Sequence, residues 1–267
     1  MQKTSLQLCG FTLMMGIFGA FLIWVQSRAA FEEGTGLPIL NSPWNWAVFL
    51  FLLANAAALI FLVRSLKKHK HPADYQAALK NPMTAYPIVA VLFGLIMLMG
   101  AFVTTLQSLV SAFDWFDLVM SILAMISAVG LTSFLRSANK SGRGASIKII
   151  FIVLFLCIWL VSAYKYYASE PVIWRFAPRI ITISVTLLAF YYVAGFVYND
   201  PKPLRTLYFC QLGALLSIAT LADTLPMGQQ IISFAMAAFM LLISFSLINN
   251  MNAEAPPLGG GAGDQFV

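Results

Sequence analysis

The stretch YPIVAVLFGLIMLMGAFVTTLQ, from Tyr86 to Gln107, decides the fold of this chain. It contains no charged side chain, and apolar residues fill most of it. A helix needs about 20 mostly apolar residues to cross the hydrocarbon core of a bilayer. The stretch meets that requirement, so it predicts a transmembrane helix.

Seven further stretches meet the same requirement. They are Leu6–Gln26, Trp44–Val63, Phe116–Leu135, Ile147–Tyr164, Pro178–Tyr198, Leu207–Thr224 and Met227–Ile248. Almost no loop separates the last two, and Pro226 between them suits the start of a helix better than its interior, so a tight turn is expected there. We therefore expect an all-α fold, a polytopic transmembrane helix bundle of about eight spans arranged as four helical hairpins.

The composition leads to the same fold class. The chain has 267 residues, of which 60% are hydrophobic and 10% are charged, whereas a soluble domain carries about 25% charged residues. This small number of charged residues cannot cover a water-facing surface of normal size. We therefore expect lipid to surround most of the chain. Residues 1–250 are expected to form a single transmembrane domain, and the Gly/Pro-rich residues 251–267 a disordered cytoplasmic tail.

The positive charges are distributed unequally between the two sides of this bundle. One side has twelve, namely Lys3, Arg64, Lys67, Lys68, Lys70, Lys80, Arg136, Lys140, Arg143, Lys148, Lys202 and Arg205. The other side has four, namely Arg28, Lys165, Arg175 and Arg179. Because cytoplasmic loops carry the excess of Lys and Arg, both termini are predicted to be cytoplasmic. We expect an integral protein of the bacterial plasma membrane, with which the short loops and this asymmetry are compatible.

The first apolar run also admits a second interpretation, as a cleaved signal peptide. Lys3 precedes it and the small residues of SRAA follow it. The run is longer than the 7–15 residues typical of a signal peptide's apolar region, which favours a span. Cleavage would leave the orientation of the other spans unchanged.

The longest link on the basic side runs from Arg64 to Pro82. Within it, the segment ADYQAALK follows Pro72 and is rich in residues that favour a helix. We expect a short helix there, lying at the membrane surface.

The sequence argues against an enzyme. No histidine and no mid-span carboxylate occurs in any predicted span, and no G-x-S-x-G, H-E-x-x-H or P-loop pattern is present. The three cysteines lie singly within apolar runs, without the spacing of a metal site. We therefore expect no catalytic residues, no cofactor and no metal. Nucleic-acid binding is set aside, because the cations lie in short links between spans.

A cluster of cations on the less basic side is the leading candidate site. Arg179 follows Pro178, which predicts that it lies in the first turn of a span, where free backbone N–H groups favour anions. Arg175, Arg179 and Lys165 are therefore candidate ligands of an anionic small molecule or a lipid headgroup. Their candidate counter-charges are Asp114, Asp117, Asp223 and Glu170. In the alternative interpretation the arginines pair with these acids or extend to lipid phosphates.

Three polar residues within spans are candidates to line a pore: Asn55, Thr105 and Gln211. An amide buried in hydrocarbon without a partner is costly, so each needs a reason for its position. Hydrogen bonds between helices supply an alternative reason that involves no substrate.

Two functions remain open. The first is a permease-type transport protein for a small solute or lipid, with an outward-facing vestibule that attracts anions. The second is a non-catalytic membrane subunit, scaffold or sensor that acts through partner proteins. The expected partners are the lipid bilayer, an anionic ligand, and a partner membrane protein or a second copy of the chain.

Overall fold

The computed structural model describes residues 2–32, 37, 39, 42–81, 83, 85–110, 115–138, 144–167, 172–223 and 226–251. Side chains 166, 167 and 173–175 lie outside this description. So does the predicted disordered tail, apart from Met251.

The described residues are mainly helical, and eight of the helices are long and apolar enough to cross a membrane. The long helices are α1 (Gln2–Ala29), α2 (Pro43–Ser65), α4 (Ala85–Val110), α5 (Trp115–Ser137), α6 (Ala145–Tyr167), α7 (Ile173–Val197), α8 (Pro203–Ala219) and α9 (Met227–Asn249). The short ones are η1 (Leu66–Lys68), α3 (Tyr75–Leu79) and η2 (Thr220–Ala222). The prediction of a multi-span membrane protein is confirmed.

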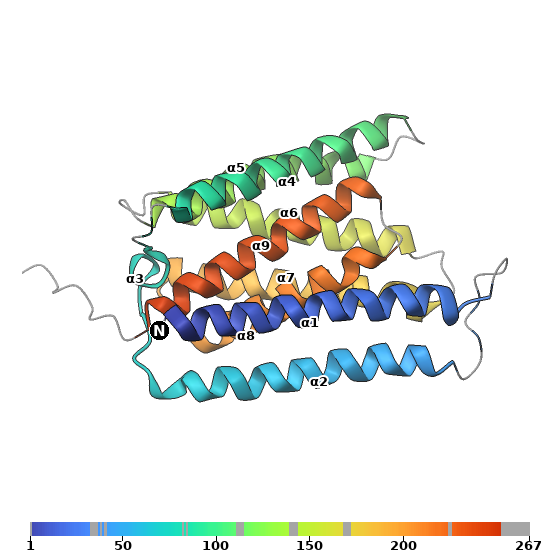
Figure 1. Cartoon of the computed structure of the whole chain (residues 1–267). Helices are drawn as coiled ribbons and strands as arrows, with labels where there is room; N and C mark the ends of the chain where they lie inside the picture. The colour runs from blue at the N-terminus through green and yellow to red at the C-terminus, as the bar shows by residue number, and fades with distance from the viewer. Residues whose placement is uncertain are drawn as a thin grey trace, which may run out of the picture.

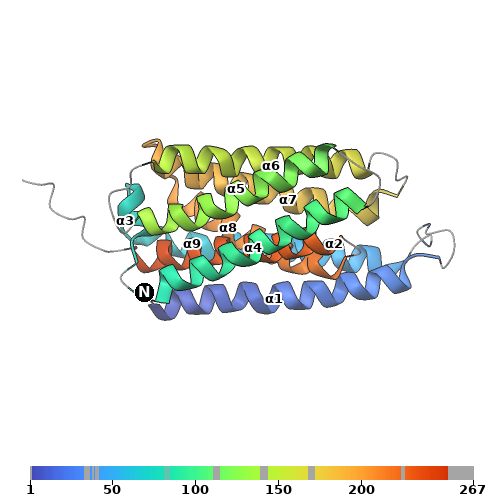
Figure 2. The same cartoon turned by 90° about the horizontal axis from the view of Figure 1, so that it is seen from above.

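The eight long helices lie side by side in one bundle (Figure 1, Figure 2). The predicted hairpin pairs α1–α2, α4–α5, α6–α7 and α8–α9 are in contact, but so are α5–α6 and α7–α8. The division into four hairpins therefore stays a prediction. We call the end where α1 begins and α9 ends the basic end, since Arg64, Arg136, Lys148 and Lys202 belong to it. The opposite end is called the far end.

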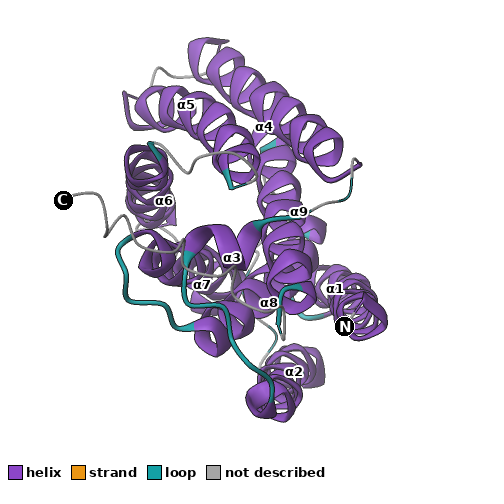
Figure 3. Ribbon diagram, turned by 90° about the vertical axis from the view of Figure 1, so that its left-hand side faces the viewer, coloured by secondary structure: helices purple, strands orange, loops and turns teal. Residues whose placement is uncertain are grey.

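Burial is greatest in the last two helices. Within the most apolar window of each helix, 72% of the residues of α8 and of α9 are buried, against 22% for α2. Helix α9 contacts α1, α4 and α8, and α8 contacts α1, α2 and α7, whereas α2 lies at the edge of the bundle (Figure 3). The hydrophobic core is thus built around α8 and α9, as the small residues Gly213, Ala214 and Ala237 allow.

Helix α7 begins before the predicted start of the sixth span, and the prediction that Arg179 lies in the first turn of its helix is wrong. Helix α7 begins at Ile173, so Pro178 lies inside the helix and Arg179 lies in its second turn rather than its first. Proline favours the first turn because it has no N–H to donate, but an early interior position is also tolerated in membrane helices. The Thr182 hydroxyl donates to the Pro178 carbonyl at 2.7 Å, which supplies a local hydrogen bond at this point.

The helix α3 was predicted, but not its burial. Tyr75, Ala78 and Leu79 are buried, and α3 contacts α7 and α9 at the basic end (Figure 3). One face of α3 thus packs against the ends of the long helices, and the expected position of this helix at the membrane surface stays a prediction. Its apolar side chains fill the space between the ends of the long helices, which the sequence of the link alone did not reveal.

Candidate functional site

Among the residues that the structure describes, Arg179 is the largest fully buried side chain, with 0% exposure. It lies six residues into α7, roughly 9 Å along the helix axis from its start at the far end. Moving an arginine to the centre of a bilayer costs about 3 kcal/mol on insertion scales, so such residues face the interior of a bundle and are commonly functional. A side chain buried in this way does not extend to lipid phosphates, as the alternative interpretation of the sequence had it.

Two other helices hold the guanidinium of Arg179. One of its terminal nitrogens donates to the Ser233 hydroxyl of α9 at 2.8 Å. The guanidinium carbon lies 4.8 Å from the centre of the Trp159 ring of α6. Cation–π contact with tryptophan stabilises a desolvated arginine by about 2 kcal/mol. Arg179 therefore joins α6, α7 and α9 at one point inside the bundle.

Trp159 brings a second donor to the same point. Its side chain is 2% exposed, and it stacks on Phe155 with ring centres 5.4 Å apart. Its indole N–H is buried and has no hydrogen-bond partner among the described residues. A buried donor without an acceptor costs about 1–3 kcal/mol, so its presence requires an explanation.

A cavity of about 670 Å³ opens at the far end between α4, α5 and α9. It is lined by Thr104, Leu106, Gln107, Ser108, Val110, Asp117, Pro226 and Gln229. Helices α4 and α9 approach closely at one side of it, because Gly228 has no side chain to collide with Thr104 and the Gly100 carbonyl. Five of these eight lining residues have polar side chains, although apolar atoms make up most of the lining surface.

Hydrogen bonds connect the buried arginine to the wall of this cavity. Ser233, which accepts from Arg179, donates to the Gln229 carbonyl at 2.8 Å, and Gln229 lines the cavity. On α6, one turn beyond Trp159, Ser162 donates to an Asp117 carboxylate oxygen at 3.0 Å. Ser233 is thus one helical turn from Gln229, which lines the cavity. Trp159 is one helical turn from Ser162, which binds Asp117 of the cavity wall. We call Arg179, Trp159 and Ser233 the buried donor site.

The other predicted charges are only partly placed. Lys165 is exposed, with its ammonium 4.6 Å from the centre of the Phe116 ring. Asp223 is half-buried, and its backbone carbonyl accepts from Gln230 at 3.1 Å. Asp114, Glu170 and the side chain of Arg175 lie outside the described residues. Of the predicted cluster, the structure therefore brings Arg179 and Asp117 near one cavity.

The three predicted pore-lining residues make hydrogen bonds within the packed bundle. Asn55 donates to the Phe51 carbonyl of its own helix at 2.8 Å. Thr105 of α4 donates to Ser121 of α5 at 2.9 Å. Gln211 is fully buried, accepts from the Thr12 hydroxyl and donates to the Cys9 sulfur at 3.6 Å.

These contacts agree with the alternative interpretation that the three residues join helices. Their role in a pore stays untested, and the cavities described here have other linings.

At the basic end, hydrogen bonds join α3 to the ends of α5 and α9. The Tyr75 hydroxyl of α3 bonds the Phe134 carbonyl and lies 3.0 Å from the Ser137 hydroxyl, both of α5. The Asn250 amide, just beyond α9, donates to the carbonyls of Ala78 and Lys80 at 2.9 and 2.7 Å. Burial raises the pKa of Tyr75 to about 12. Since this exceeds the ordinary value of about 10, the contact is intact below about pH 10 and is lost as the pH rises through 12.

Sequence reasoning missed Trp159 and Ser233. The other tryptophans fall near the predicted span boundaries, where amphipathic rings anchor a protein. Trp159 alone lies well inside an apolar run, and that position is the signal that could have identified it. Ser233 carried no such signal, because serine is common where membrane helices pack.

No known protein family, curated protein or solved structure matches this chain. Across the described ranges, no group of three or more His, Cys, Asp or Glu side chains is arranged to hold a metal ion.

Proposed function

We propose that the protein is a transport protein for a small solute with an anionic group, which binds at the buried donor site from the far end. The observation that carries this proposal is the buried indole N–H of Trp159 beside the fully buried Arg179. A carboxylate or phosphate oxygen at this point would accept from the indole and lie next to the guanidinium. Arginine is the side chain best suited to both anions.

The cavity supplies a route and a limit on the ligand. A volume of about 670 Å³ is in the range of small-molecule sites. The hydrogen bond from Ser233 to the Gln229 carbonyl connects the buried donor site to a residue of the cavity wall. Asp117 adds a negative charge to that wall. Because like charges repel, a small monoanion or a zwitterion is favoured over a multiply charged anion.

The contrast between the two ends supports transport rather than simple binding. Alternating access requires a state that is open on one side of a central site and closed on the other. The far end has the polar cavity, whereas α3 and Asn250 close the basic end. With the basic end in the cytoplasm, as the charge distribution predicts, this is an outward-facing arrangement.

The test combines binding with counterflow in liposomes. Acetate, glutamate, glycine and inorganic phosphate are first tested for thermal stabilisation of the purified protein, because a ligand that binds the folded state raises its melting temperature. Liposomes are then loaded with the unlabelled probe that stabilises best, and uptake of the labelled probe is followed. Counterflow needs no knowledge of the coupling ion. We expect uptake above that of protein-free liposomes.

Arg179→Gln should abolish both stabilisation and counterflow. The matched control is Arg28→Gln, because Arg28 is exposed at the far end and lies 4.5 Å from the Trp24 ring in a cation–π contact of the same kind. Equal losses in both variants would contradict the proposed site. Binding without counterflow would favour the alternative function, a sensor or non-catalytic subunit that acts through partner proteins.

A further inference from the structure

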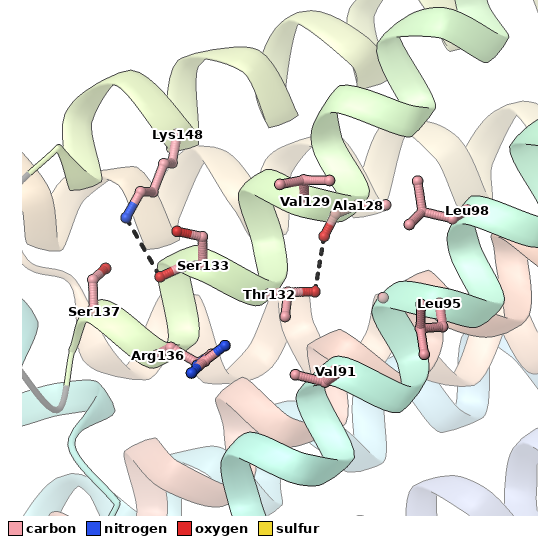
Figure 4. A pocket seen from close by; sticks show the side chains of 11 residues that line it. Val91, Leu95, Leu98, Ala128, Val129, Thr132, Ser133, Arg136, Ser137 and Lys148 are labelled. Atoms are coloured by element: carbon pink, nitrogen blue, oxygen red, sulfur yellow. Dashed lines mark hydrogen bonds between the residues drawn. The ribbon is translucent and has the colours of Figure 1, made fainter.

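A second hollow lies on the flank of the bundle near the basic end, away from the buried donor site. Its volume is about 460 Å³, and it lies between α4 and α5 beside the start of α6 (Figure 4). It is lined by Val91, Gly94, Leu95, Leu98, Ala128, Val129, Thr132, Ser133, Arg136, Ser137 and Lys148. We call this hollow the flank groove.

One part of the flank groove is an apolar slot. Leu95 and Val129 stand on its walls and are 54% and 59% exposed, so the slot faces the lipid. Helices α4 and α5 approach closely at Gly94, because a side chain there would overlap Thr132. The Thr132 hydroxyl donates to the Ala128 carbonyl of its own helix at 2.9 Å and so leaves the slot apolar.

The other part of the flank groove is cationic. Arg136 and Lys148 both lie at the end of the slot nearer the basic end, on either side of Ser133, and Leu95 and Leu98 lie at the other end (Figure 4). The Lys148 ammonium reaches the Ser133 carbonyl at 3.4 Å, which holds it over the groove. No Asp or Glu occurs among the described residues of the lining.

We propose that the flank groove binds one anionic glycerophospholipid of the leaflet at the basic end. Its phosphate would lie between Arg136 and Lys148, and one acyl chain would lie along Leu95, Leu98 and Val129. Arg136 and Val129 are seven residues apart on α5, roughly 10 Å along the axis, which is the length of several methylene groups. Basic pockets between membrane helices on the cytoplasmic side select anionic headgroups in this way.

A second groove of the same size shows why the charge pattern matters. It lies between α6 and α7 at the same end, also has a volume of about 460 Å³, and includes Asp200 and Lys202 in its lining. There the Lys202 ammonium binds the Asp200 carboxylate at 2.7 Å. A cation already neutralised by a carboxylate offers little to an anionic lipid. This groove therefore serves as an internal control.

Native mass spectrometry of the full chain in detergent tests the proposal. Phosphatidylglycerol and phosphatidylcholine are added in turn, and bound lipids are counted across a titration. We expect one saturable site that binds phosphatidylglycerol at least 10-fold more tightly than phosphatidylcholine. Arg136→Gln with Lys148→Gln should abolish this preference, and Lys202→Gln with Arg205→Gln should preserve it. Equal binding of both lipids, or the same loss in both double variants, would overturn the proposal.

A second pair of variants tests the acyl slot. Leu95→Trp should fill the slot and weaken phosphatidylglycerol binding at least 5-fold. Leu92→Trp is the matched control, since Leu92 is on the same helix, is also 54% exposed and is outside the groove lining. Glycerol 3-phosphate should not compete at millimolar concentration. Competition by it, with unchanged binding in Leu95→Trp, would mean a site for a free phosphate and would overturn the lipid proposal.

Discussion

At the basic end, Arg136, Lys148 and Lys202 lie at or near the surface of the bundle, whereas at the far end Arg179 is fully buried between three helices. The cations of the basic end lie where they can reach water and lipid phosphates. The buried arginine cannot reach either. The end with fewer cations is therefore the one where a cation is buried inside the protein and contacts neighbouring helices.

The two ends also differ in how they are filled. Apolar side chains of α3 pack at the basic end, where Tyr75 and Asn250 make hydrogen bonds. The far end has a cavity whose lining includes Gln107, Asp117 and Gln229. A variant of the basic end should therefore change the exchange of α3, whereas a variant of the buried donor site should change the affinity for an anion.

The largest effect is expected from Tyr75→Ala, which breaks the closure of the basic end. It removes a buried aromatic ring that packs on Phe134 with ring centres 4.9 Å apart, and such truncations cost about 3–5 kcal/mol. Hydrogen–deuterium exchange of the α3 peptide should become at least 10-fold faster. Tyr198→Ala, at an exposed tyrosine of the same end, should leave the rate unchanged. Slow exchange of α3 in Tyr75→Ala would contradict the closure.

A smaller effect is expected from Trp159→Phe, which tests the part that the indole N–H plays in the buried donor site. The substitution keeps a six-membered aromatic ring at this position and removes the pyrrole half of the indole together with its N–H. A hydrogen bond to a charged acceptor contributes about 1.5–3 kcal/mol, so the affinity for the stabilising anion should fall about 10-fold to 100-fold. Isothermal titration calorimetry measures this fall. Trp24→Phe is the control, and an unchanged affinity in Trp159→Phe would remove the indole from the site.

The smallest effect is expected from Gln211→Leu, which separates packing from ligand binding. It breaks the bonds of Gln211 to Thr12 and Cys9 between α8 and α1. Such interhelical hydrogen bonds contribute about 0.6 kcal/mol on average and at most about 1.7. SDS-induced unfolding should show a loss in this range, while anion affinity stays the same. Asn55→Leu should cost less, because Asn55 bonds within its own helix.

Much of the fold could be predicted from the sequence because hydropathy acts locally. Each run long enough to cross the bilayer must be a helix, so the run from Tyr86 to Gln107 is sufficient to place α4. Pro226 likewise marks the turn before α9, which begins at Met227. The start of α7 was misplaced because the preference of proline for a first turn is statistical, and Pro178 departs from it.

The candidate site was only partly predictable, because it depends on how distant helices meet. The sequence identified Arg179 as unusual, but its partners Trp159 and Ser233 come from spans that precede and follow its own. Hydropathy predicts that these spans exist, but it does not predict which faces of the helices pack against one another. The burial of α3 was missed for the same reason, since its contacts are with α5, α7 and the end of α9.

The most direct test of the buried donor site is the NMR signal of the Trp159 indole N–H. Protein labelled with ¹⁵N at the tryptophan indoles should give six indole signals, one for each tryptophan, and Trp159→Phe assigns one of them. Titration with acetate, glutamate, glycine and inorganic phosphate should shift the Trp159 proton downfield with saturation, leave Trp24 unchanged, and have no effect in Arg179→Gln. A Trp159 signal that none of the four probes moves, or that moves equally with Trp24, would contradict the account.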